Sequence, residues 1–299
     1  MTASILSFVQ QLLAARLDPK AADFVRTTQQ EIQADILDKR FTVLISLASR
    51  YIPRSTLSPS DAELALAEQL LPGWNPASWS MLEAVRVSFI LAHKDVAAAD
   101  FAGRFSQWFT YADEGEQCAY YRVIPLLPEP QRFVWRAAEG CRTNMRSIFM
   151  SVACDSPFPV KHFDEVAWNQ LIVKALFTET PLWRVYGLDS RLSDTLAVMV
   201  LDYMDERRSA GRSIPIDAWL CLGKYQDSRV DATIAAALAG DSQQACAAIL
   251  TLARAQNTQA LQQLKDQTLD SQRLALIQQA LLGPIDQYAF QQLLQIYAA

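Results

Sequence analysis

The stretch SMLEAVRVSFILAH, residues 80–93, decides the fold class. It begins with Ser80 and, three residues later, Glu83, which is the pattern of a capping box at the start of a helix. The residues that follow predict a helix that runs to about His93. Apolar residues recur at three and four positions along the chain, and no segment keeps a period of two between hairpin signals, so we expect an all-helical protein.

Prolines and capping residues separate the helical segments. The expected helices span residues 3–16, 20–50, 60–71, 79–93, 95–110, 112–124, 131–153, 164–178, 194–210, 215–223, 230–239, 242–255, 257–267, 271–282 and 286–298. Short amphipathic helices with close connections favour antiparallel pairs, as in an irregular helical bundle or an α-solenoid-like, HEAT-like stack. Composition changes after about residue 225, so we predict two domains: 1–224, with a polar core around 112–212, and C-terminal helical pairs over 225–299.

Composition and charge narrow the classes of function. The 299 residues are 51% hydrophobic and 20% charged, with a net charge of −5. Phosphate binding needs a clustered basic surface, and none is visible, so we expect no nucleic-acid partner. No apolar run reaches the roughly eighteen residues of a membrane span, and the first residues lack the features of a signal peptide. We therefore expect a cytoplasmic protein.

Known cofactor motifs are missing from the sequence. The two histidines and five cysteines, with no C-x-x-C, do not provide the common zinc sites. The nine glycines are scattered, and neither a dinucleotide fingerprint nor a P-loop is present. No cofactor is therefore evident, although a carboxylate-rich site would suit Mg²⁺.

Charged residues adjoin the apolar stripe of segment 131–153. Projected as one helix, this segment places Glu139 and Arg142 beside the core. A partly buried guanidinium needs a partner, and its planar fork suits a carboxylate or a phosphate. We therefore expect Arg142 to flank the core.

The segment 194–210 repeats this pattern. Arg207 falls on the apolar stripe of the predicted helix, and Asp202 and Glu206 form a neighbouring acidic stripe. In one interpretation, these two carboxylates balance Arg142, Arg207 and Arg212 in an interhelical ion-pair network with a structural role. In the other, the same groups line a site.

Polar side chains also interrupt the segments between these helices. His162 lies in an extended turn set by two prolines, where it suits either packing or acid–base chemistry. In the helix expected at 164–178, Lys174 lies on a flank from which it can reach water. Asn169 shares the apolar stripe and should face inward, near Arg142 and the stripe of Arg207, where a buried amide must find partners.

The middle of the chain, from about residue 112 to 223, resembles the EboA family of metabolite traffic proteins. The resemblance is carried, in order, by ADEGE (112–116), LLPEP (126–130), EGCRTNMRSIF (139–149), PFPVKHFDEVAWNQLIVKALF (157–177), GLDSR (187–191) and DYMDERRSAGR (202–212). The matching positions include Glu139, Arg142, Thr143, Asn144, Trp168, Asn169, Lys174, Asp202, Glu206, Arg207 and Arg212.

The chain departs from the family pattern at two places. Ser156 and Phe158 stand where the family tends to have Asn and Tyr. Asp205 and Arg208 stand where it tends to have His and Trp, so a mechanism that depends on that His is in doubt here.

The resemblance implies a cytoplasmic bacterial protein of a secondary-metabolite gene cluster. Its neighbours there are a prenyltransferase-type membrane enzyme, a TatD-like hydrolase, a dehydroquinate-synthase-like protein and a sugar-isomerase-like protein. They imply a small polyol, cyclitol or prenylated precursor as the metabolite, and other proteins of the cluster as partners.

Three hypotheses follow. In the first, the protein binds or carries a small polar, anionic or prenylated precursor in a pocket lined by Arg142, Asn144, Trp168, Asn169, Arg207 and Arg212. In the second, it is an enzyme for a cyclitol or (di)phosphate intermediate, with acid–base or Mg²⁺-assisted chemistry at Glu139, Asp202 and Glu206 with Lys174 or His162. In the third, it is a scaffold for partner enzymes. Whether it is an enzyme is left open.

Overall fold

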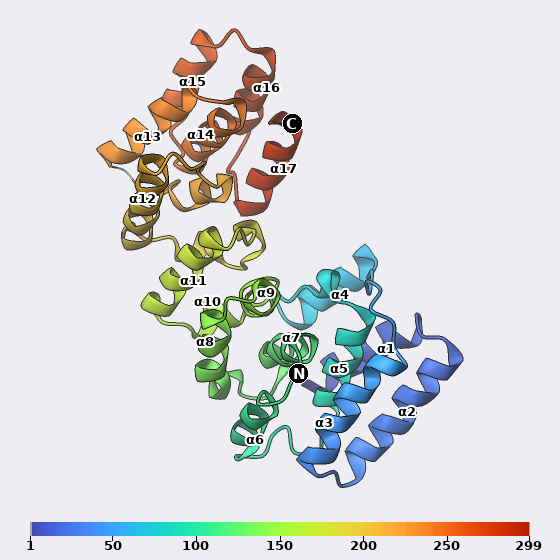
Figure 1. The fold of residues 1–299 in the computed structure, drawn as a ribbon. Coiled ribbons are helices and arrows are strands. Elements are labelled where there is room, and N and C mark those ends of the chain that lie inside the picture. Colours follow the sequence, from blue (N-terminus) through green and yellow to red (C-terminus); the bar gives the residue numbers. More distant parts are fainter. Residues whose placement is uncertain (1, 226, 299) are drawn as a thin grey trace. The chain divides into compact units, whose positions relative to one another are not determined.

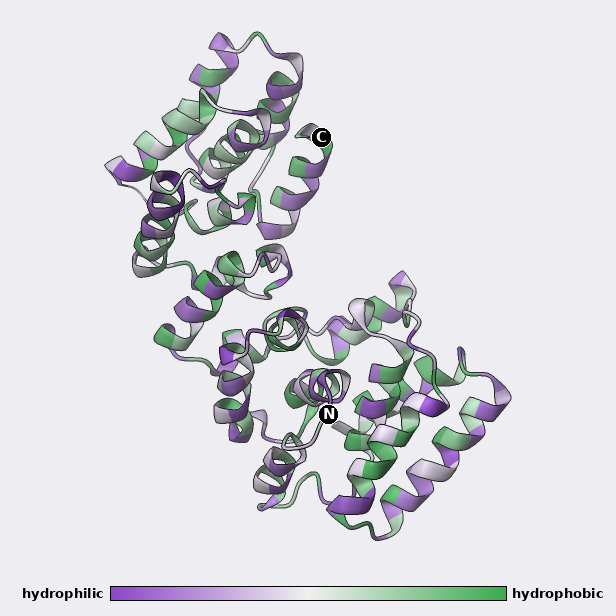
Figure 2. Ribbon diagram, viewed as in Figure 1, coloured by the Kyte–Doolittle hydropathy of each residue, from purple (hydrophilic) through white to green (hydrophobic). Residues whose placement is uncertain are grey.

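The fold consists of helices joined by short loops (Figure 1). The computed structural model describes residues 2–225 and 227–298. Within these residues, β pairing is limited to one antiparallel bridge between Thr56 and Ser80, so the prediction of an all-α protein is confirmed. Figure 2 shows hydrophobic and hydrophilic residues along the same helices, as amphipathic helices require.

The chain forms two compact units, Met1–Trp168 (unit 1) and Asn169–Ala299 (unit 2). The boundary between them falls within the helix α11 (Glu165–Phe177). The predicted domains, 1–224 and 225–299, stay a prediction.

Unit 1 contains ten α-helices and the start of α11 among its described residues. They are α1 (Thr2–Ala14), α2 (Pro19–Ala34), α3 (Asp38–Leu47), α4 (Asp61–Leu70), α5 (Met81–Leu91), α6 (Phe101–Trp108), α7 (Glu114–Val123), α8 (Val134–Arg142), α9 (Arg146–Ala153) and α10 (Phe158–His162). Short 3-10 helices connect them: η1 (Ala48–Arg50), η2 (Pro76–Ser78), η3 (Ile124–Leu126) and η4 (Pro130–Phe133).

The core of unit 1 forms around α5. Ser80 and Glu83 form the predicted capping box at its start, and after Glu83 the residues up to the end of the helix are all buried. A helix that is buried on every side must be apolar all round, which explains the run of apolar residues in this segment. It packs against α1, α2 and α7. Its one buried charge is Arg86, with a side chain that is 2% exposed.

Unit 2 continues from α11 through 3-10 segments into further α-helices. They are η5 (Leu182–Arg184), η6 (Leu188–Arg191), α12 (Asp194–Ser209), η7 (Ile216–Cys221), α13 (Ser228–Leu238), α14 (Ser242–Arg254), α15 (Thr258–Gln267), α16 (Ser271–Ala280) and α17 (Gln287–Tyr297). In Figure 1, α13, α15, α16 and α17 lie around α14.

The core of unit 2 forms around α14 in the same way. Every residue from Ala245 to Arg254 is buried.

Asp189 connects three elements of this unit. The Arg254 side chain, 3% exposed, places Nη2 2.5 Å from Asp189 Oδ1. The other carboxylate oxygen of Asp189 accepts the backbone N–H of Gln287 at 2.9 Å, and the Gln287 amide donates to the carbonyls of Trp183 and Val185. Asp189 therefore joins η6, α14 and α17.

The predicted helix over 131–153 is wrong as a continuous element. The structure has η4 and α8, then a break at residues 143–145, then α9. At the break, Thr143 is extended and its hydroxyl accepts the backbone N–H of Met145 at 3.1 Å. This local bond competes with the helical pattern, as hydroxyl side chains commonly do. The stripe projected across both halves therefore does not exist.

Other predicted boundaries also differ. The segment 20–50 is divided into α2 and α3, because the chain becomes extended at Asp35 and buries Ile36. Residues 95–100 form turns before α6. The helix predicted at 215–223 is the 3-10 helix η7, over Ile216–Cys221. The extended turn expected before residue 164 contains the short helix α10.

Candidate functional site

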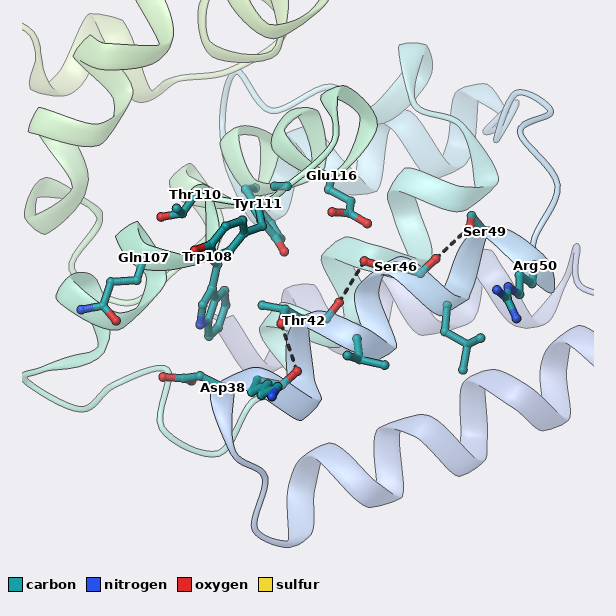
Figure 3. A pocket seen from close by; sticks show the side chains of 15 residues that line it. Asp38, Thr42, Ser46, Ser49, Arg50, Gln107, Trp108, Thr110, Tyr111 and Glu116 are labelled. Atoms are coloured by element: carbon teal, nitrogen blue, oxygen red, sulfur yellow. Dashed lines mark hydrogen bonds between the residues drawn. The ribbon is translucent and has the colours of Figure 1, made fainter.

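A groove of about 1020 Å³ follows the outer face of α3 in unit 1 (Figure 3). Its other wall consists of the end of α6, the loop 110–112 and two residues of α7, Glu116 and Tyr120. The lining residues are Asp38, Lys39, Thr42, Val43, Ser46, Leu47, Ser49, Arg50, Gln107, Trp108, Thr110, Tyr111, Ala112, Glu116 and Tyr120. Hydroxyl, amide, charged and aromatic side chains therefore share one concave surface.

The wall formed by α3 and η1 carries a row of hydroxyl groups. Thr42 donates its hydroxyl hydrogen to the Lys39 carbonyl, Ser46 to the Thr42 carbonyl and Ser49 to the Ser46 carbonyl, at 2.8–3.2 Å. Figure 3 shows these bonds along the helix. Each hydroxyl hydrogen is already used in one of these bonds. The oxygen keeps its lone pairs, so it can accept a further hydrogen bond but cannot donate one. The row is therefore a set of acceptors for a ligand that donates hydrogen bonds.

The opposite wall is aromatic. Trp108 is 4% exposed and packs on Phe41 at a centroid distance of 4.4 Å, which fixes its ring at the base of the groove. Tyr120 is also buried, whereas Tyr111 is 96% exposed at the rim. Two rings are therefore held by the core, and a third is free to pack on a bound molecule.

The Asp38 carboxylate lies at one end of α3, and Arg104 neutralises it. Arg104 donates to both carboxylate oxygens, at 3.0 and 2.8 Å, and also reaches Asp95 at 3.0 Å. This bidentate pairing holds the pKa of Asp38 below its usual range, and Trp108 makes a smaller contribution in the same direction. Asp38 is therefore an ionised group with its charge already balanced.

Glu116 is the second carboxylate of the groove and is also neutralised. Its Oε2 accepts the backbone N–H of Asp113, and the Asp113 side chain accepts the N–H of Glu116, which makes a capping box at the start of α7. Its Oε1 lies 3.5 Å from Nη2 of the buried Arg86. A Cβ at Gly115 would lie 3.2 Å from Arg86 Nη1. The stretch ADEGE therefore builds this wall over a buried guanidinium.

The groove has a surplus of positive charge. Each lining carboxylate has an arginine partner that is not itself a lining residue. The two lining cations, Lys39 and Arg50, are exposed and form no ion pair within the described part of unit 1. An anionic group on a ligand would therefore find unused cations at either end of α3.

The predicted site residues of unit 1 do not belong to this groove. Arg142 pairs with Glu139, one helical turn before it, and its side chain is 69% exposed. The expectation that Arg142 flanks the core is wrong, because α8 ends at this residue and points it to solvent. Asn144 is exposed in the break that follows.

His162 and Trp168 lie at the end of unit 1. His162 ends α10, packs on Phe158 at a ring distance of 4.8 Å and has a pKa that burial lowers, with Lys161 adding to the effect. Trp168 is buried in α11. His162 therefore packs on Phe158, and its predicted acid–base role stays a prediction.

In unit 2, Asn169 is 3% exposed, as expected for a residue that faces inward. Its Oδ1 makes no hydrogen bond in the described chain. Lys174 is partly exposed. Their predicted roles in a site stay a prediction.

The acidic stripe of α12 lies on the surface. Asp202 is exposed and pairs with Arg229 at 2.8 Å, and Glu206 is exposed. Arg207 donates from Nε to the Ser213 carbonyl at 2.5 Å and packs on the Tyr203 ring. Asp202 was predicted to pair with arginines such as Arg207 and Arg212. In the structure its partner is Arg229, so this part of the prediction is wrong.

Among residues 2–225 and 227–298, no three His, Cys, Asp or Glu side chains gather as they would around a metal ion. No helix in the same residues is long and apolar enough to cross a membrane.

The groove was not predicted from the sequence, because its lining comes from several helices and a loop and from residue types that are ordinary on a surface. One signal was available. Arg86 is the single charge in the apolar run that follows Glu83, and a charge in a buried helix requires a partner. ADEGE supplies that partner in Glu116.

The chain was compared with known proteins. A family model described as "Metabolite traffic protein EboA" matches residues 5–223, which is more than half of the chain. Comparisons with curated proteins and with solved structures gave no match.

Proposed function

The chain belongs to the EboA family of metabolite traffic proteins, and we propose that it binds a small metabolite in the groove of unit 1. The proposed ligand combines several hydroxyl groups with an apolar part and is carried rather than converted. Binding in this groove replaces the pocket predicted from the sequence as the first candidate site.

The hydroxyl row opposite the aromatic wall is the observation that supports this proposal. The hydroxyls of Thr42, Ser46 and Ser49 donate to backbone carbonyls, which leaves their oxygens as acceptors for the hydroxyls of a polyol. Across the groove, Trp108 and Tyr111 offer ring surface to carbon atoms. A groove of about 1020 Å³ also has the volume that small-molecule sites usually need.

The charge of the groove supports an anionic substituent on the same ligand. Arg50 lies beside Ser49 and Ser46, so one end of the hydroxyl row ends in an unpaired guanidinium (Figure 3). A guanidinium suits a phosphate or carboxylate because two of its donors are parallel. We therefore expect a phosphorylated polyol to bind more tightly than the neutral polyol.

The exposure of the rim supports a carrier. Tyr111 is 96% exposed and Val43 is 48% exposed, so a ligand can enter and leave without opening the core. Transfer to another protein requires such access.

Isothermal titration calorimetry tests the proposal. The probes are myo-inositol, inositol monophosphate and geranyl monophosphate, which separate hydroxyl, anionic and apolar contributions. Ser46→Phe fills the groove from an exposed position on α3, and we expect it to weaken binding by about tenfold or more. Thr27→Phe, on the exposed side of α2, is the matched control and should bind as the unchanged protein does.

Two results would count against the proposal. Equal affinity in Ser46→Phe and Thr27→Phe would move the ligand away from the groove. Absence of binding for all three probes would remove the proposed ligand class.

A further inference from the structure

A second cavity lies wholly within unit 2. It has a volume of about 250 Å³ and lies between the loop after α12, the 3-10 helix η7, the helix α13 and the start of α14. Its lining residues are Arg208, Arg212, Ser213, Ile214, Trp219, Thr233, Ala236, Ala237, Gly240, Asp241 and Gln244. We call it the unit 2 pocket.

The loop that forms one side of this pocket is held in place on two sides. Gly211 has a φ of +66°, which favours glycine and turns the chain after α12. Arg207 Nε then donates to the Ser213 carbonyl at 2.5 Å, and Gln244 Nε2 donates to the Ile214 carbonyl at 3.0 Å. The pocket is therefore preorganised by the fold, with Arg207 as a positioning residue.

The base of the pocket is also fixed. Trp219 is 1% exposed, and its Nε1 donates to Gln244 Oε1 at 2.8 Å. Trp219 therefore lines the pocket with its polar end already satisfied. Ala236 and Ala237 keep the opposite side free of bulk. A small organic group fits between these surfaces.

Two polar side chains that line the pocket have no partner in the described part of the chain. Thr233 lines the pocket at 7% exposure, and its hydroxyl forms no hydrogen bond within residues 2–225 and 227–298. Arg212 is exposed and forms no ion pair within the same residues. A ligand in the pocket therefore finds a hydroxyl and a guanidinium that no protein group occupies.

The other charged residues of the lining are already engaged. Arg208 pairs with Asp205 at 2.5 Å, and the Asp241 carboxylate caps α14 by accepting the backbone N–H of Gln244 at 2.9 Å. Asp241 keeps its negative charge at the start of α14, and Arg212 is the lining cation that forms no ion pair within the described residues. The Arg212 side of the pocket therefore favours a ligand group with negative charge and hydrogen-bond acceptors.

We propose that the unit 2 pocket binds the phosphate group of a small phosphate ester. Arg212 supplies the charge-assisted hydrogen bonds, the hydroxyls of Thr233 and Ser213 donate to the remaining phosphate oxygens, and the organic part packs on Trp219. This site is separate from the groove of unit 1, and the proposal does not depend on the one made for the groove.

Calorimetric titration of the full chain with inorganic phosphate and phenyl phosphate tests this site. We expect both probes to bind, phenyl phosphate more tightly because its ring reaches Trp219. Arg212→Gln should weaken both by about tenfold, the usual effect of losing a charge-assisted hydrogen bond. Lys265→Gln removes the same charge from α15, outside the pocket, and should leave both affinities unchanged.

Thr233→Val gives a second, nearly isosteric test. It removes only the hydroxyl, and the fold should tolerate it because that hydroxyl bonds to nothing in the described structure. We expect weaker phosphate binding with an unchanged unfolding midpoint. Equal binding by Arg212→Gln and Lys265→Gln would overturn the proposal, as would failure of both probes to bind the unchanged chain. Ser46→Phe in unit 1 should retain phosphate binding at this site.

Discussion

Arg86 and Glu116 face each other inside unit 1, with Nη2 3.5 Å from Oε1 and side chains only 2% and 7% exposed. The pair joins the central helix of the unit to the start of α7. Because Glu116 also lines the groove, one residue belongs both to the core and to the candidate site. Stability and binding should therefore be linked at this position.

Arg86→Met should destabilise unit 1 by about 3 kcal/mol, because it leaves the Glu116 carboxylate buried without its guanidinium. Chemical unfolding, followed by circular dichroism, measures the change. The double variant Arg86→Met with Glu116→Leu should recover part of the loss, since no charge is then left unpaired. Additive losses in the two single variants and the double variant would contradict the interaction.

Asp189→Asn should cost about 3 kcal/mol in unit 2, because Arg254 is buried and loses its charged partner. Asp202→Asn is the matched comparison. It breaks an Arg–Asp pair whose side chains are 43% and 64% exposed, so its cost should stay below about 1 kcal/mol. Thermal unfolding of the two variants measures the shift of each midpoint. Equal shifts would show that burial of an ion pair does not determine how much it stabilises the protein.

Gly140→Ala should destabilise the protein by about 1–3 kcal/mol. The added Cβ would lie 2.7 Å from the ring of Tyr121 and 2.7 Å from a methyl group of Val152, so α8 would have to move away from α7 and α9. Gly103→Ala is the control, because a Cβ there meets nothing within 4 Å. In the helix α6 it should stabilise by about 0.5–1 kcal/mol. If the unfolding midpoints of Gly140→Ala and Gly103→Ala shifted in the same direction, close packing at Gly140 would not be the cause of the loss.

The free energy of unfolding should fall as the pH falls below about 6.5. Burial lowers the pKa of His93, with Arg104 adding to the effect, and burial also lowers the pKa of His162. Each imidazole takes up its proton more readily in the unfolded chain, so stability is full above the ordinary value of 6.5 and is lost as the pH falls toward the folded value.

Urea unfolding between about pH 7.5 and 5.5 measures this slope above the range in which most carboxylates titrate. His93→Asn keeps an acceptor for the backbone N–H of Asp95, which donates to the imidazole at 3.2 Å. This variant and His162→Gln should each reduce the slope. The chain has no further histidine, so a double variant with the slope of the unchanged protein would refute the assignment.

The sequence allowed correct prediction of features that depend on neighbouring residues. The capping box of Ser80 and Glu83 and the burial of Asn169 follow from spacing along one helix. The same reasoning failed at Thr143, where one side-chain hydrogen bond ends a helix whose apolar pattern continues. Periodicity cannot detect such a bond, because it contains no information on the turn itself.

The candidate sites were harder to predict because they depend on distant contacts. Arg86 meets a carboxylate thirty positions away along the chain, and the groove joins residues of α3, α6 and α7. Arg212 was predicted to bind a ligand, and it lines the unit 2 pocket. The hydroxyl of Thr233 was not predicted, since nothing in its surrounding sequence marks it as buried.

The bonds made by Asp189 limit where this chain can be truncated. Asp189, Trp183 and Val185 lie within the stretch that matches the family, but they are held by Arg254 and Gln287, which lie beyond residue 223. A fragment that stops at residue 223 would lose both partners and leave these groups without compensation. We therefore expect a stable fragment that contains residues 183–189 to extend past the family boundary, at least as far as α17.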